Sequence, residues 1–223
     1  MARVNLERRA EIGREKRART RAAILGAARA CYSDPDGTPI TIESVTQAAG
    51  VAKGTFYVHF SDLAALEADL GDAIILELAD RHESARQAVA DPLDRMATAV
   101  AIFLRDLAAS PAQARLVARA IVALPDVATA VQGRLRADLT EAQLAGSLSL
   151  ASLDLAVRIV VALVQQAAVL SGDGKLGADA IPELLRAILR ALGCTPEKAA
   201  ERTRTAIGNA DQFAQHIIAQ SVR

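Results

Sequence analysis

The chain has 223 residues and a formal net charge of zero, with 52% hydrophobic but only 3% aromatic residues. This length allows one or two compact domains, and abundant Ala, Leu and Val with 3.6-residue periodicity predict an all-α protein. Two distant cysteines, Cys31 and Cys194, argue against a disulfide framework. The charged N-terminus argues against a signal peptide. The most apolar run, residues 159–164, is too short to cross a bilayer, so we expect a cytoplasmic protein.

Charge is divided unevenly along the chain. Residues 1–60 hold ten Lys/Arg and six Asp/Glu, a balance of plus four, whereas the other 163 residues hold sixteen and twenty, a balance of minus four. This segregation is expected when the N-terminal part of a protein meets phosphate groups.

Basic residues crowd residues 1–20, where glutamates are interspersed at helical spacing. Two interpretations remain open: a solvated helical extension, or a basic arm that lies on the DNA backbone or in a minor groove. Arg17 in this segment and Arg21 directly after it are candidate DNA contacts. A helix over residues 20–32 is expected to follow, ended by a turn at residues 34–37.

Residues 41–60, TIESVTQAAGVAKGTFYVHF, contain two short helical patterns joined by a glycine. Thr41 is a suitable N-cap for the first helix, and Gly50 is expected to end it in a left-handed conformation. The second helix is predicted to run from Ala52 to about His59.

The second helix has an aromatic face and a slim face. Helical spacing places Phe56 and Phe60 together, with Gly54, Thr55 and Val58 opposite. A slim, polar face suits entry into a DNA major groove. The glycine costs the helix roughly 1 kcal/mol but allows its backbone to approach a phosphate. The alternative is a pair of ordinary core helices with a polar outer face.

This stretch resembles the DNA-binding motif of the tetracycline-repressor (TetR) family of bacterial regulators. The matching positions are Thr41, Ile42, the turn 49–51, residues 53–57 and residues 59–60. Two places depart from the motif. Thr46 replaces the usual alanine, and its hydroxyl needs a partner such as the carbonyl four residues back. Leu63 and Ala64 stand where the family often has a lysine that touches a phosphate.

The residues expected to contact DNA are Arg17 and Arg21 together with Thr41, Lys53, Gly54, Thr55, Tyr57 and His59. Lys53, Thr55 and Tyr57 are expected to reach the groove and the phosphates, and Gly54 to permit close approach. Thr41 and His59 are expected to reach backbone phosphates.

The next helix is expected to begin after a cap at Ser61 or Asp62. Its apolar stripe consists of Leu63, Leu66, Leu70, Ile74 and Leu78. We expect a three-helix DNA-binding domain in residues 1–65 and a larger helical ligand-binding and dimerisation domain in residues 66–223. Caps, prolines and glycines predict further helices over residues 91–109, 110–124, 125–146, 152–170, 178–192 and 195–220.

The helix over residues 152–170 is apolar nearly all round, which predicts burial on more than one side. The resemblance implies pairing through the last two main helices, and hence a homodimer that reads two half-sites. The same domain is expected to hold the effector pocket. Candidate lining residues are Met96, Phe103, Arg119, Arg158 and Gln165; the alternative is that the arginines reach solvent and the glutamine bonds across the dimer. The scarcity of aromatic residues favours a hydrophobic or amphipathic effector.

The sequence therefore predicts a homodimeric transcriptional regulator, a repressor that leaves a palindromic double-stranded operator when a small molecule binds. Catalysis is not expected, because the three histidines lack metal-ligand spacing and no nucleophile elbow, phosphate loop or zinc pattern occurs. No cofactor or metal is predicted. The alternative is a helical dimeric adaptor that keeps the fold without operator binding, which the missing lysine near Leu63 favours.

Overall fold

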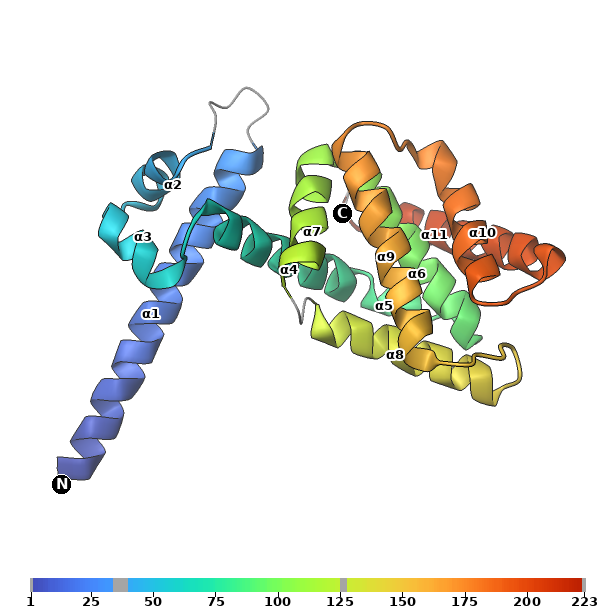
Figure 1. The fold of residues 1–223 in the computed structure, drawn as a ribbon, viewed down its shortest axis with the longest axis horizontal. Coiled ribbons are helices and arrows are strands. Elements are labelled where there is room, and N and C mark those ends of the chain that lie inside the picture. The colour runs from blue at the N-terminus through green and yellow to red at the C-terminus, as the bar shows by residue number, and fades with distance from the viewer. Residues whose placement is uncertain (1, 34–39, 125–127, 222–223) are drawn as a thin grey trace. The chain divides into compact units, whose positions relative to one another are not determined.

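The computed structural model describes residues 2–33, 40–124 and 128–221, and the regular elements within them are all helices (Figure 1). The predicted all-α class is confirmed. The chain divides into two compact units, Met1–Leu70 and Gly71–Arg223. The division falls inside helix α4 (Leu63–Arg81), five residues after the boundary expected at residue 65.

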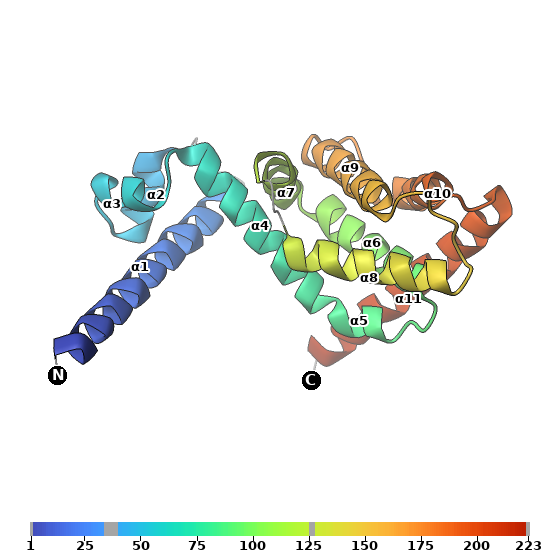
Figure 2. The ribbon, with the colours of Figure 1, turned by 60° about the horizontal axis from the view of Figure 1, so that its bottom comes forward.

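The first unit is built on α1 (Ala2–Ser33), which is one continuous helix and longer than the expected 20–32. Residues 2–19 contain no proline, and their Ala, Arg and Glu residues favour a helix, so nothing breaks it there. α2 (Ile42–Ala49) packs on α1, and α3 (Lys53–His59) packs on α2. The first half of α1 runs on beyond both helices (Figures 1 and 2). The expected turn at 34–37 lies outside the described residues.

Local chemistry sets both ends of α2. The Thr41 hydroxyl accepts the Ser44 amide at 3.1 Å, and the Ser44 hydroxyl accepts the Thr41 amide at 3.0 Å, forming a reciprocal capping box. Gly50 has φ +64°, so the predicted left-handed end is confirmed. At the start of α4, the Asp62 carboxylate accepts the Ala65 amide at 2.8 Å and serves as the cap.

The second unit continues from α4 through α5 (Glu83–Gln87), α6 (Pro92–Ala109), α7 (Pro111–Ala123), α8 (Thr129–Leu144), α9 (Leu153–Gly172), the short turn η1 (Ala178–Ala180), α10 (Ile181–Ala191) and α11 (Pro196–Ser221). Prolines open α6, α7 and α11 as predicted. The prediction has no counterpart of α5. The start predicted for α8 at residue 125 lies outside the described residues.

α6 is the central helix of the second unit, in contact with α8, α9, α10 and α11, while α7 packs along α9. Asp91 caps α6 by accepting the amides of Leu93 and Asp94 at 2.9 and 3.0 Å. On its inner face Leu93, Leu104 and Leu107 are fully buried. Burial of each such side chain is worth about 1.5–3 kcal/mol of transfer free energy.

α9 is covered over a broad face by α6, α7, α8 and α10 and remains open on the opposite side. Ala156 and Val160 lie in the core, whereas Leu155 is 57% exposed and Ala162 is exposed. By length and hydropathy α9 is also long and apolar enough to cross a membrane, a test that core helices of soluble proteins pass as well. The open apolar side of α9 is therefore a candidate contact between two copies of the chain.

Candidate nucleic-acid interface and ligand cavity

Two buried phenylalanine rings hold α3 in place. Phe56 is 0% and Phe60 3% exposed, and their ring centroids lie 5.6 Å apart. Ile24, Val45 and Leu66 are also fully buried in this unit. The prediction that both phenylalanines face inward is confirmed, and the opposite side of α3 faces outward.

The outward side of α3 is slim and largely exposed. Lys53 and Gly54 are exposed, Tyr57 is 51% and Val58 68% exposed, and Thr55 is half-buried. A Cβ added to Gly54 would meet nothing within 4 Å, so no internal contact requires a glycine there. The glycine instead leaves room for a partner outside the helix.

Lys53 is paired with Glu43 of α2, and both side chains are exposed. The hydrogen bond and charge of Lys53 hold the pKa of Glu43 below its usual range, and those of Glu43 raise the pKa of Lys53. A phosphate that approaches Lys53 therefore also meets the Glu43 carboxylate.

Two other predicted DNA contacts also have partners inside the first unit. The Arg21 guanidinium pairs with Asp69 of α4 and lies 5.1 Å from the centroid of the Phe60 ring. Arg21 therefore ties α1 to α4, and its contact with DNA stays a prediction. Thr41 uses its hydroxyl in the cap of α2. Arg17, in contrast, is exposed, like every side chain from residue 8 to residue 19.

The departures from the motif have local consequences. Thr46 is 5% exposed, and its hydroxyl donates to the Glu43 carbonyl at 3.0 Å, three residues back rather than the expected four. At the start of α4, Leu63 is half-buried and Ala64 is exposed, so neither supplies a cation there. His59 is half-buried at the end of α3.

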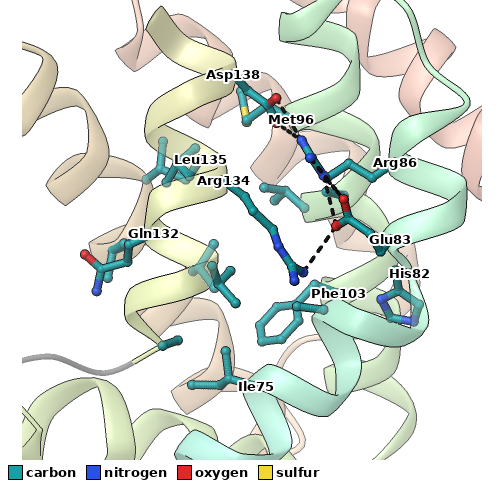
Figure 3. Close-up of a pocket in the computed structure, with 18 of the residues that line it drawn as sticks. Ile75, His82, Glu83, Arg86, Met96, Phe103, Gln132, Arg134, Leu135 and Asp138 are labelled. Atoms are coloured by element: carbon teal, nitrogen blue, oxygen red, sulfur yellow. Dashed lines mark hydrogen bonds and ion pairs between the residues drawn. The ribbon is translucent and has the colours of Figure 1, made fainter.

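The second unit contains a cavity of about 140 Å³ whose wall comes mainly from α4, α6, α8 and α9 (Figure 3). Of the candidate pocket residues, Met96 and Phe103 line this cavity. Arg119, Arg158 and Gln165 do not line this cavity, and their place in an effector pocket stays a prediction. Arg158 and Gln165 line another groove, beside α9.

Charged side chains gather on one side of the cavity (Figure 3). Asp138 is only 3% exposed on its side chain and accepts Arg86 Nη1 on both oxygens at 2.8 Å and Arg95 Nε at 2.7 Å. Burial raises the pKa of Glu83, but hydrogen bonds from Arg86 and Gln87 outweigh this effect and hold the pKa below its usual range. Glu83 is therefore ionised at neutral pH.

Arg134 reaches into the cavity from α8 (Figure 3). Its Nη2 lies 2.7 Å from Asp80 Oδ1, and its Nη1 lies 3.2 Å from Glu83 Oε2. The Nη1 atom is buried, and its geometry toward Glu83 does not satisfy a hydrogen bond. Because an unsatisfied buried donor costs about 1–3 kcal/mol, this nitrogen is suited to bind a ligand oxygen.

His82 is buried at the edge of the same cavity, where its Nε2 lies 2.9 Å from Asp106 Oδ2 and its ring meets the edge of Phe213. This arrangement pairs one histidine with one carboxylate and covers it with an aromatic ring. Across the described ranges, no three His, Cys, Asp or Glu side chains are grouped to hold a metal ion.

Known proteins resemble the chain in structure. No family model and no curated protein matches it. RolR in complex with the ligand resorcinol has a TM-score of 0.66 at 20% identity, over 85% of this chain and 95% of that one. Thermus thermophilus FadR, a TetR-family transcriptional repressor in complex with lauroyl-CoA, has a TM-score of 0.60 at 16% identity, over 78% of this chain and 96% of that one. A γ-butyrolactone receptor has a TM-score of 0.53 at 22% identity, over 88% of this chain and 98% of that one. The chain has the TetR fold.

The motif in residues 41–60 thus predicted the TetR fold, which the comparisons show over 78–88% of the chain. The sequence did not identify several residues of the interface and the cavity. Val58 was placed on the slim face of α3 but not among its contacts. Arg134 and Asp138 lie four residues apart on α8, a spacing that puts them on one helical face. Their partners on and beside α5 are about fifty residues away, and no local pattern connects them.

Proposed function

We propose that the protein is a homodimeric transcriptional regulator of the TetR type. In this proposal it represses transcription from a palindromic operator and is released by a small molecule bound in the cavity of the second unit. The observation that carries the proposal is that Phe56 of α3 and Phe60 directly after it are buried, while a slim hydrogen-bonding side of α3 is exposed.

On the DNA, the exposed side of α3 enters the major groove. Thr55 and Tyr57 donate and accept hydrogen bonds, and Gly54 lets the backbone approach. Val58 is exposed and aliphatic, which suits contact with a thymine methyl group. Lys53 exchanges Glu43 for a phosphate.

Further phosphate contacts flank α3 on both sides. Thr41 and His59 reach phosphates beside the helix, and Arg17 with its exposed neighbours on α1 reaches phosphates farther out. Arg21 acts indirectly, by holding α1 against α4.

Two copies pair through the open side of α9 together with α10. A two-fold dimer presents two α3 helices to half-sites one helical turn, or a multiple of it, apart. The TetR fold supports this arrangement, and α11 is an addition to the pairing helices. Such a regulator works in the cytoplasm, where its operator DNA lies.

Selection of bound sites from random double-stranded DNA tests the proposal. We expect a palindrome, and gel-shift affinity for it that falls steeply with added salt, because phosphate contacts release counterions. An adaptor without operator binding would enrich no sequence and shift no fragment at any salt concentration.

A small molecule that releases the selected operator would complete the test. The structural neighbours include proteins bound to resorcinol and to lauroyl-CoA, which supports a small effector but leaves its chemistry to this chain's own cavity.

A further inference from the structure

The size of the cavity limits what it can hold. Its volume is about 140 Å³, below the 300–1,000 Å³ typical of pockets for drug-sized ligands. An engineered apolar cavity of about 150 Å³ in another protein stays dry and takes up benzene. The cavity is partly open and accommodates one ring or a body of similar size, so most of a long acyl chain would lie outside it.

The wall of the cavity is apolar over most of its surface. Ile75 from α4, Val100 and Phe103 from α6, and Val160 and Val164 from α9 contribute hydrocarbon groups. These groups offer no hydrogen bonds, so water gains little there and an apolar ring gains from burial.

The apolar wall contains one polar site (Figure 3). Arg134 Nη1 is a buried donor without a hydrogen-bond acceptor, and the ionised Glu83 Oε2 lies 3.2 Å from it. A hydroxyl group both accepts and donates a hydrogen bond. It can therefore accept from Arg134 and donate to Glu83 at the same time.

The charges around the cavity leave no counter-ion for a charged ligand. Two arginines and two carboxylates of the lining neutralise one another: Arg86 pairs with Asp138 and Glu83, and Arg134 pairs with Glu83. An anionic ligand would face the Glu83 carboxylate, and a cationic ligand would face Arg134. Because an unpaired charge is expensive to bury, the site favours an uncharged molecule.

We propose that the cavity binds a neutral molecule the size of a single ring, whose one hydroxyl contacts both Arg134 and Glu83. The binding of this molecule is inferred from the cavity alone. Its role as the effector also rests on the proposed function.

Calorimetric titration of the full-length chain with phenol, toluene, benzoate and dodecanoate tests this assignment. We expect phenol to bind once per chain and more tightly than benzoate, and dodecanoate not to bind. Ala99→Leu, which adds volume to the cavity wall, should abolish phenol binding while thermal unfolding shows that the chain remains folded.

Arg134→Met tests the polar contact. It should lower the ratio of phenol affinity to toluene affinity about tenfold, since a hydrogen bond to a charged donor is lost. Arg136→Met makes the same change two positions along α8 at a residue outside the cavity wall, and should leave that ratio unchanged. Both affinities are measured on the same variant, so a general loss of stability affects them equally and does not change their ratio.

Preference for benzoate or dodecanoate, absence of phenol binding, or an unchanged ratio in Arg134→Met would overturn the assignment. DNA binding is measured separately, without ligand, on the selected operator. If the chain binds phenol but not DNA, the cavity assignment is supported and the proposed regulator function is rejected.

Discussion

Phe56 and Tyr57 are neighbours in the sequence with opposite roles in the structure. Phe56 is fully buried and Tyr57 is half exposed. We expect Phe56→Ala to destabilise the first unit by about 3–5 kcal/mol, because it leaves a cavity in the core. Tyr57→Ala should weaken operator binding and leave stability nearly unchanged. Urea unfolding and gel-shift titration measure the two effects, and equal losses of stability would contradict the assigned faces of α3.

Glu43 and Lys53 set the charge in front of α3. Glu43→Gln removes a carboxylate beside the expected phosphate, so operator affinity should rise several-fold at low salt. Lys53→Gln should lower affinity and reduce the slope of log affinity against log salt by about one. Asp173→Asn is the control, because it removes an exposed, lysine-paired carboxylate in the second unit. An equal gain from Asp173→Asn would show a general charge effect.

At the scale of helices, one glycine permits the close approach of α4 and α7. A Cβ built on Gly71 would lie 2.1 Å from the Leu116 carbonyl oxygen. We expect Gly71→Ala to lower the free energy of unfolding by about 1–3 kcal/mol, because backbone must shift to admit the methyl group. Gly26→Ala in α1 meets nothing within 4 Å and should stabilise by up to about 1 kcal/mol. Denaturant unfolding of both variants measures the contrast, and a neutral Gly71→Ala would mean that the helices can separate freely.

Arg202 of α11 holds the start of α6 through Asp91 and Asp94, at 2.7 Å from each carboxylate. Burial raises the pKa of Asp91, but the Arg202 hydrogen bond and backbone amides outweigh it, so the folded pKa lies below the usual range. Asp91 therefore contributes stability above its unfolded pKa of about 4, and loses it as pH falls through the lower folded value. Burial raises the pKa of Asp94 even though the hydrogen bond and charge of Arg202 lower it. Asp94 therefore changes stability with pH in the opposite direction to Asp91.

The consequence can be measured by thermal unfolding between pH 7 and pH 3. Arg202→Met should unfold at a lower temperature than the unmodified chain at pH 7, and the difference should shrink as the carboxylates become protonated. A difference that stays constant down to pH 3 would indicate lost packing of the arginine stem and not a lost ion pair.

At the scale of the whole molecule, the proposed dimer depends on the open side of α9. Ala162 is exposed on that side, beside the apolar Leu155 and Ile159. We expect Ala162→Arg to convert a dimer to a monomer in sedimentation velocity and to lower operator affinity at least tenfold, because one head reads one half-site. Ala88→Arg places the same charge at an exposed site after α5 and should leave the dimer intact. A dimer that survives Ala162→Arg would place the interface elsewhere.

The sequence by itself determined the helix pair α2 and α3, because the signals there are local. The Thr41 cap, the left-handed Gly50 and the spacing of Phe56 and Phe60 each act within one or two helical turns. The prolines that open helices in the second unit act over equally short distances, and those helix starts were predicted too. The helix α5 was missed because it is only five residues long and lacks a side-chain cap.

Tertiary structure decided which side chains meet and which remain free. Arg21 and Asp69 are 48 residues apart, and Arg86 and Asp138 are 52 apart. A charged residue on a helix has many candidate partners in the sequence, and the packing of helices selects one of them. The cavity has the same origin, since its empty volume is what remains when helices from distant parts of the chain pack against one another.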